Sequence, residues 1–153
     1  MTVNGGIIPE GIWVLDEARS RMLEPASVTL WVIRDDGERL VWVVVETKDA
    51  GEISIKSFDG RYGGEPTAVS GSGFVVSLSS PAPRTVRVEG EIPNMGPFSE
   101  IDIVSEDGRQ MRVNGEVRVG DEVKSWYEEF NWRGPMPGVV TEPANPNVEE
   151  VSR

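Results

Sequence analysis

The sequence predicts an all-β protein, an antiparallel up-and-down β-barrel of about eight to ten strands with a short N-terminal helical turn. Short runs rich in β-branched and aromatic residues follow one another along the chain, separated by tight-turn signals such as Asp35-Asp36-Gly37 and Glu106-Asp107-Gly108. No segment keeps a helical period for more than about two turns. Closure into a barrel is favoured because an open meander would leave two unpaired edges. A two-sheet sandwich is the alternative, but it usually needs longer crossover connections.

The elements can be justified in order. The first strand opens at Gly11-Ile12-Trp13, and only residues 16–23 could form a short helix. Runs 28–34 and 39–47 flank the turn at Asp35-Asp36-Gly37 and therefore form a hairpin. Pro81 and Pro83 end the run 73–80, because proline cannot donate to a strand ladder. The remaining predicted strands are 53–58, 85–92, 100–105, 110–119 and 122–132, with a glycine-rich segment at 59–64.

Length and charge limit the domain organisation and the partners. A chain of 153 residues suits a single domain, here a barrel over residues 1–132 followed by a proline-rich, irregular tail over 133–153. The net charge of −11 would repel nucleic acid and anionic membrane surfaces, so neither is an expected partner. The sequence shows no signal peptide and no apolar run of membrane-spanning length, and we expect a cytoplasmic protein.

The chain contains no histidine and no cysteine, which excludes imidazole bases, thiol nucleophiles and zinc sites built from those residues. Catalysis would have to use carboxylates, Tyr, Ser/Thr, Lys or Arg. The adjacent acidic pairs Asp16-Glu17 and Glu128-Glu129 are poor candidates for a carboxylate dyad, because neighbours in a strand point to opposite faces. No phosphate-loop or calcium-loop spacing is present, so we expect neither a metal nor a cofactor.

Alternation along the strands suggests which polar side chains enter the barrel. In three predicted strands, polar residues share a face with apolar ones. These are Arg34 with Val28, Leu30 and Val32, then Glu46 with Leu40, Trp42 and Val44, and then Ser57 and Asp59 with Ile53 and Ile55. If these apolar faces line the interior, then Arg34, Glu46, Ser57 and Asp59 project inward near strand ends. The alternative is that they are surface charges beside turns. Val41, Val43 and Val45 make the opposite face of the second hairpin strand equally apolar and leave its phase open.

Five tryptophans are many for this length, and they predict an aromatic interior. Either Trp31 or Trp42 is expected inside, together with Trp126 and other aromatic residues of the last strand. Tyr127 beside Glu129 could act as a general acid or orient a carbonyl group. Aromatic residues around a cavity would suit a flat or apolar ligand, whereas the same residues as plain core would give a barrel filled by its own side chains.

Three motifs follow one another along the chain: residues 11–20, from Gly11-Ile12-Trp13 to Ser20, then Phe58-Asp59-Gly60-Arg61-Tyr62, then residues 105–111. In this order they resemble the G-x-W opening, the central DG segment and the late DG turn of a bacterial lipocalin-like family of calycin-type barrels. The resemblance covers about residues 10–132. It implies a barrel with a pocket, in which Trp13 closes one end beneath a basic side chain of a late strand, here Arg118 or Arg112. The family is not defined by one reaction.

These observations predict a protein that binds a small apolar or aromatic molecule as a monomer or homodimer. The expected ligand-binding residues are Trp31, Trp42, Arg61, Tyr62 and Trp126. The alternative is a cofactor-independent lyase, isomerase, cyclase or hydrolase that uses the same pocket. Its acid and base groups would be Asp59, Glu46 and Tyr127, with Arg34 or Arg61 on an anionic or carbonyl oxygen. A structural module with a filled barrel is a third possibility.

Overall fold

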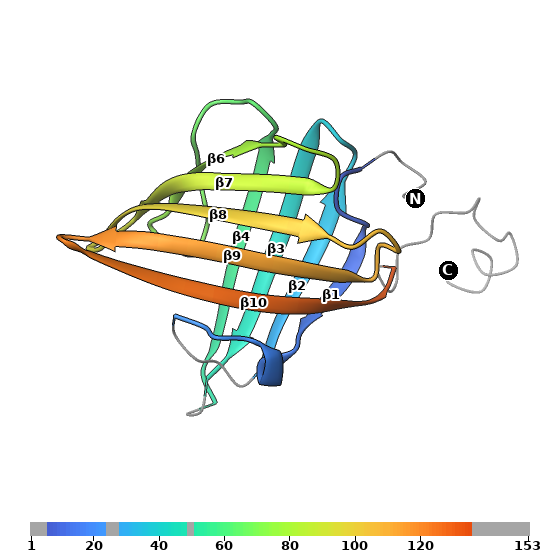
Figure 1. Cartoon of the computed structure of the whole chain (residues 1–153), viewed down its shortest axis with the longest axis horizontal. Helices are drawn as coiled ribbons and strands as arrows, with labels where there is room; N and C mark the ends of the chain where they lie inside the picture. Colours follow the sequence, from blue (N-terminus) through green and yellow to red (C-terminus); the bar gives the residue numbers. More distant parts are fainter. Residues whose placement is uncertain (1–5, 24–27, 49–50, 136–153) are drawn as a thin grey trace, which may run out of the picture.

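The barrel predicted from the sequence is present in the computed structural model, which describes residues 6–23, 28–48 and 51–135. Ten antiparallel strands form one sheet in the order β4-β3-β2-β1-β10-β9-β8-β7-β6-β5. In Figure 1, β7 to β10 lie across the front while β1 to β4 cross behind them at a steep angle. The strands are β1 (Gly11–Leu15), β2 (Val28–Asp35), β3 (Arg39–Thr47), β4 (Ile53–Arg61), β5 (Thr67–Ala68), β6 (Val75–Ser79), β7 (Thr85–Ile92), β8 (Gly96–Val104), β9 (Gln110–Val119) and β10 (Glu122–Gly134).

The two ends of this sheet meet and nearly close the barrel. Ser57 of β4 and Ser70 exchange two backbone hydrogen bonds of 3.0 and 2.8 Å, and the Gly63 amide donates to the Leu78 carbonyl at 2.7 Å. Every other pair of neighbours in the sheet is joined by an antiparallel ladder, and the ladder between β1 and β10 shifts its register between Ile12 and Trp13. Among the described residues no helix is long and apolar enough to cross a membrane.

Most predicted strand boundaries agree with the structure to within two residues, but β5 was not predicted and β8 begins at Gly96, four residues before the predicted start. Three further differences concern the helix, the glycine-rich segment and the end of β10. The predicted helix is a single 3-10 turn, η1 (Glu17–Arg19). Asp59 and Gly60 continue β4 and do not form a turn, because they pair with Val41 and Leu40 of β3. The Phe58 ring lies over Gly60, where any Cβ would meet it at 2.2 Å. Strand β10 runs to Gly134, two residues past the predicted domain boundary, and most of the predicted tail, residues 136–153, lies outside the described residues.

The G-x-W opening has a clear structural basis. Gly11 has a φ of +138°, and a Cβ there would lie 2.1 Å from the Gly134 carbonyl oxygen, so only glycine allows β1 and β10 to approach so closely. Trp13 is completely buried, and its indole donates to the Pro9 carbonyl at 3.0 Å. The prediction that Arg112 or Arg118 lies over the Trp13 ring is wrong, because both side chains point to solvent from the outer face of β9.

A buried side chain, Asp35, joins three segments at the end of the barrel where the chain enters. Asp35, the last residue of β2, is 1% exposed. Its Oδ2 accepts hydrogen bonds from the backbone amides of Ile7 and Ile8, at 3.1 and 2.9 Å, and from the Tyr62 hydroxyl, at 2.8 Å. Its Oδ1 accepts from the Gly37 amide at 2.9 Å. One side chain therefore joins the N-terminal segment, the β2–β3 turn and the chain beyond β4.

The strand phase predicted for β2 and β4 is wrong. Thr29, Trp31, Ile33 and Asp35 face the interior from β2, so Arg34 is exposed on the outside. The inward residues of β4 are Ser54, Lys56, Phe58 and Gly60, which places Ser57 and Asp59 on the outer face. The prediction failed because the outer face of this half of the barrel is also aliphatic. It carries Ile12, Val14, Val28, Leu30, Val32, Val41, Val43, Val45, Ile53 and Ile55.

The Asp35 hydrogen bonds make a stability prediction. Asp35→Ala leaves several buried donors without an acceptor and should lower the free energy of unfolding by about 3 kcal/mol or more. Tyr62→Phe removes one of these bonds and should cost about 1–2 kcal/mol, but much less in the Asp35→Ala background. Urea unfolding of the two single variants and the double variant measures this coupling.

Asp36→Ala is the matched control. Asp36 also accepts backbone amides, from Glu38 at 2.9 Å and Arg39 at 2.8 Å, but it does so on the exposed turn. We expect this substitution to cost less than about 1 kcal/mol, because water replaces the lost bonds. An equal cost for Asp35→Ala and Asp36→Ala would show that burial of the Asp35 carboxylate is unimportant.

Candidate functional site

The barrel interior is divided into a packed half and an open half. At the Asp35 end, Trp13, Ile33, Val104, Met111 and Phe130 are buried in the core. Towards the other end a cavity of about 410 Å³ remains. Its mouth lies beside Met22 and Leu23 and the β7–β8 turn at Pro93 and Met95. The interior is thus neither completely filled nor completely hollow.

Tryptophans from three strands line the cavity. Trp31 of β2 and Trp42 of β3 both face inward, with ring centroids 6.5 Å apart, where the sequence analysis expected only one of them inside. Trp126 of β10 lies on the opposite side, and Phe98 of β8 packs near it with ring centroids 6.3 Å apart. Three of the predicted ligand-binding residues, Trp31, Trp42 and Trp126, therefore line the cavity.

The indole of Trp126 lies flat across β9, and a glycine makes this possible. Gly115 is the β9 residue paired with Trp126, and a Cβ there would lie 2.1 Å from two of the indole carbons. With no side chain in the way, the Trp126 Nε1 reaches past β9 and donates to Glu100 Oε1 of β8 at 3.1 Å. The indole thereby fixes the orientation of a carboxylate inside the cavity.

Four acidic side chains lie in or beside this cavity. Glu46 of β3, Glu100 of β8 and Glu128 of β10 line it, and Asp102 of β8, 3% exposed, lies behind Glu100. Lys56 of β4 also faces inward; its Nζ lies 3.4 Å from Glu46 Oε1 and 5.4 Å from the centroid of the Phe74 ring. Within the described ranges no three acidic side chains are arranged to hold a metal ion.

Burial and mutual repulsion raise the pKa values of three of these acids, Glu100, Asp102 and Glu128. Loss of solvation raises the pKa of Glu128 to about 8, and the charges of Glu100 and Glu46 add to this effect, while Lys56 opposes it. Burial also raises the pKa of Asp102 well above its usual range, reinforced by the neighbouring charge of Glu100. The pKa of Glu100 is raised by burial too, although hydrogen bonds from Asp102 and Trp126 limit the rise. The interaction between the two side chains favours the protonated form of Asp102 and the ionised form of Glu100.

Several buried polar atoms at this site have no partner among the described residues. They are the Thr29 hydroxyl, the Trp42 indole nitrogen and Asp102 Oδ1. Thr29 is 3% exposed, lines the cavity and is paired with Glu46 across the β2–β3 ladder. An unsatisfied buried hydroxyl beside a carboxylate indicates that this part of the cavity is suited to a polar group.

The other predicted site residues lie elsewhere. Arg34 and Arg61 are exposed, and Tyr127 lies on the outer face of β10, where partial burial and a hydrogen bond to Glu129 raise its pKa. Tyr62 is inside the barrel, but its hydroxyl is taken by Asp35, and burial next to that carboxylate raises its pKa well above the ordinary range. Of the four predicted catalytic side chains, only Glu46 lines the cavity.

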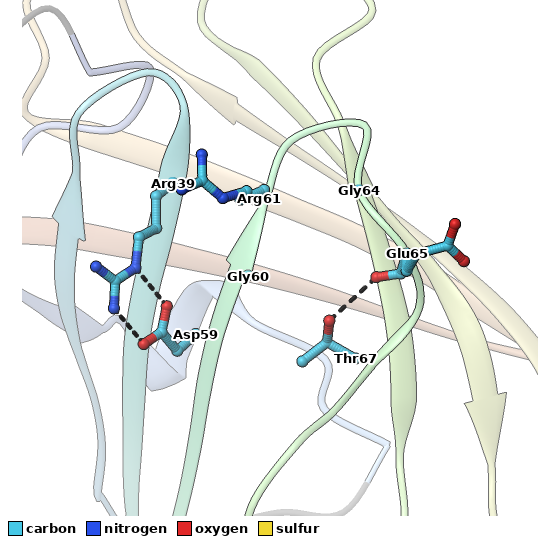
Figure 2. A pocket seen from close by; sticks show the side chains of 7 residues that line it. All are labelled: Arg39, Asp59, Gly60, Arg61, Gly64, Glu65 and Thr67. Atoms are coloured by element: carbon cyan, nitrogen blue, oxygen red, sulfur yellow. Dashed lines mark hydrogen bonds and ion pairs between the residues drawn. The ribbon is translucent and has the colours of Figure 1, made fainter.

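Asp59 belongs to a separate, polar hollow on the outer surface, of about 350 Å³, shown in Figure 2. Arg39 of β3 faces Asp59 of β4 and binds it through two contacts, Nε to Oδ1 at 2.6 Å and Nη2 to Oδ2 at 2.5 Å. This ion pair lowers the pKa of Asp59, the opposite of the rise that a general acid or base at neutral pH requires. The hollow is completed by Gly60, Arg61, Gly64, Glu65 and Thr67.

Comparison with known proteins identifies the architecture. Of the solved structures that resemble the chain, one is a crystal structure of a mutant of the fluorescent protein UnaG, with a TM-score of 0.52. The alignment covers 82% of this chain and 96% of that one, at 8% sequence identity, so the similarity is one of fold. No family model matches the sequence, and no curated protein matches it.

Of the inward carboxyl groups, Glu46 was predicted from the sequence, whereas Glu100, Asp102 and Glu128 were not. For Glu128 a signal existed, because the alternation that places Trp126 and Phe130 on one face places Glu128 with them. For Glu100 and Asp102 the alternation along the strand predicts the opposite orientation, because Ile101 and Ile103 would be expected inside. In the structure Ile103 is 44% exposed. Their orientation follows from the ladder with β9, in which Glu100 pairs with Gly115 and Asp102 with Val113.

The raised pKa of Glu128 predicts how stability depends on pH. Between about pH 4.5 and pH 8 the folded protein keeps a proton that the unfolded chain releases, so this group lowers stability as pH rises. Glu128→Gln removes that effect. The difference in unfolding free energy between the variant and the unmodified protein should therefore shift in favour of the variant by about 2–4 kcal/mol from pH 5 to pH 9.

Guanidinium unfolding at the two pH values measures this difference. Glu116→Gln, the same substitution on the exposed face of β9, is the control and should show no such gain. A Glu128→Gln profile parallel to that of the unmodified protein would show that this carboxyl group titrates normally.

Proposed function

We propose that this protein binds a small, largely apolar or aromatic molecule in the barrel cavity, as a lipocalin-like, calycin-type barrel. The observation that carries the proposal is that Trp31, Trp42 and Trp126 line a volume of about 410 Å³ that the side chains of the described residues leave open. Ligand pockets are typically lined by apolar and aromatic side chains with a few polar groups that fix orientation. Barrels of this size hold either their own side chains or one small ligand.

The sequence motifs support the same family. Gly11 and Trp13 have the structural roles that a G-x-W opening requires, a close approach of backbones and a fully buried indole. The fold similarity to the UnaG barrel agrees with this assignment, because it extends over most of both chains. The acidic groups among the aromatic residues provide the polar contacts that would orient a bound molecule.

Titration with the neutral dye Nile red tests the binding function. We expect dye emission to rise and tryptophan emission to fall with the same saturable, one-to-one dependence. Trp42→Leu should weaken binding about tenfold, because it removes part of the aromatic wall. The matched control is Val43→Ser, which changes the next residue of β3 on the outer face and should leave binding unchanged.

The control also distinguishes the cavity from the outer aliphatic face. Dye binding that Val43→Ser weakens and Trp42→Leu does not would place the dye outside the barrel. That result would contradict the proposed function and favour a barrel that acts as a structural module.

Acid–base catalysis in the same cavity is the second candidate, and Glu128 is the observation that favours it. A carboxyl group with a pKa of about 8 still carries at pH 7 the proton that a general acid must donate. Glu46 is the candidate for the base, because it lines the cavity and its ion pair with Lys56 holds it there.

A substrate of such a reaction would be turned over at a rate that falls as pH rises through about 8, as Glu128 loses its proton. Glu128→Gln should then lower the rate about 100-fold or more, and Glu116→Gln should leave it unchanged. Equal rates in the two variants would exclude Glu128 as the general acid.

A further inference from the structure

Three carboxyl groups line the cavity, and their oxygens accept hydrogen bonds once they are deprotonated. Glu46, Glu100 and Glu128 project from β3, β8 and β10, and the charges of Glu46 and Glu100 both act on Glu128. The Thr29 hydroxyl, which has no partner in the described part of the chain, adds a fourth acceptor beside Glu46. A protonated amine has three donors and no acceptor, so this arrangement is complementary to it.

The cavity is unsuited to an anion. Lys56 is the cation furthest inside, and it is already engaged by Glu46 at 3.4 Å and by the Phe74 ring at 5.4 Å. Lys48 also lines the cavity, at the exposed end of β3. A bound carboxylate would have to approach three acidic side chains in a space of about 410 Å³.

The aromatic side chains favour the same class of ligand. Trp31, Trp42 and Trp126 can pack against the apolar body of the ligand and also attract a positive charge through their ring faces. Carboxylates and aromatic rings together are the groups that recognise organic cations. From this geometry we propose that the natural ligand is an organic cation, an amine or guanidine attached to an apolar or aromatic body. This inference rests on the proposed binding function.

Binding of a cation would be coupled to release of protons. Glu128 faces Glu46, Lys56 and Glu100, with Asp102 behind, and without a ligand its repulsion by the other acids is relieved by protonation. A bound ammonium group replaces that proton as the neutralising charge. Affinity for a cation should therefore rise with pH, as long as the amine itself stays protonated.

Three naphthyl probes of different charge test the proposal by isothermal titration calorimetry. They are 1-naphthylmethylamine, which is cationic, 1-naphthalenemethanol, which is neutral, and 1-naphthoate, which is anionic. At pH 7 we expect the amine to bind at least about tenfold more tightly than the alcohol, and the anion most weakly. Amine binding should release protons, seen as a heat that differs between phosphate and Tris buffers, and should strengthen from pH 6 to pH 8.

Glu128→Gln should lose most of the preference for the amine and most of the proton release while it still binds the alcohol. Glu116→Gln on the outer face should behave like the unmodified protein. If the alcohol or the anion binds as tightly as the amine, the cavity binds ligands but is not selective for cations, and only this inference is overturned. If none of the three probes binds, the proposed binding function fails as well.

Discussion

The buried Asp35 carboxylate is the interaction on which the arrangement of this barrel depends. It accepts backbone amides from the chain entering the barrel and from the β2–β3 turn, and it accepts the Tyr62 hydroxyl from the chain leaving β4. These segments are far apart in the sequence, and the bonds are charge-assisted and shielded from water. Because these hydrogen bonds and the packed core occupy one end of the barrel, the remaining interior space lies at the other end.

That division of the interior creates the conditions for function. The core around Trp13, Met111 and Phe130 is apolar and closed, whereas the cavity places Glu46, Glu100 and Glu128 beside three tryptophans. Acidic groups so poorly solvated are costly unless they hold protons or bind a positive charge. Several such groups in one cavity lower the stability of the folded protein. Clusters of this kind are typical of binding and catalytic sites.

Much of the fold could be predicted from the sequence, because strand boundaries depend on local chemistry. Turn residues and prolines delimit the strands, and the Gly11 and Trp13 pair marks the first one. Of the candidate site, the same local reasoning located the tryptophans and Glu46. It did not locate Glu100, Asp102 or Glu128 and it placed Arg34 and Asp59 on the wrong side of their strands.

The sequence by itself thus determined that the chain is an all-β protein with an aromatic interior and no imidazole or thiol chemistry. Only the tertiary structure decided which side chains face the cavity. A strand with two apolar faces has no preferred phase of its own, and pairing with a neighbour must choose it. Strand β9 alternates Met111, Val113 and Val117 strictly with polar residues, and its ladder turns Glu100 and Asp102 inward against the preference of the isoleucines beside them.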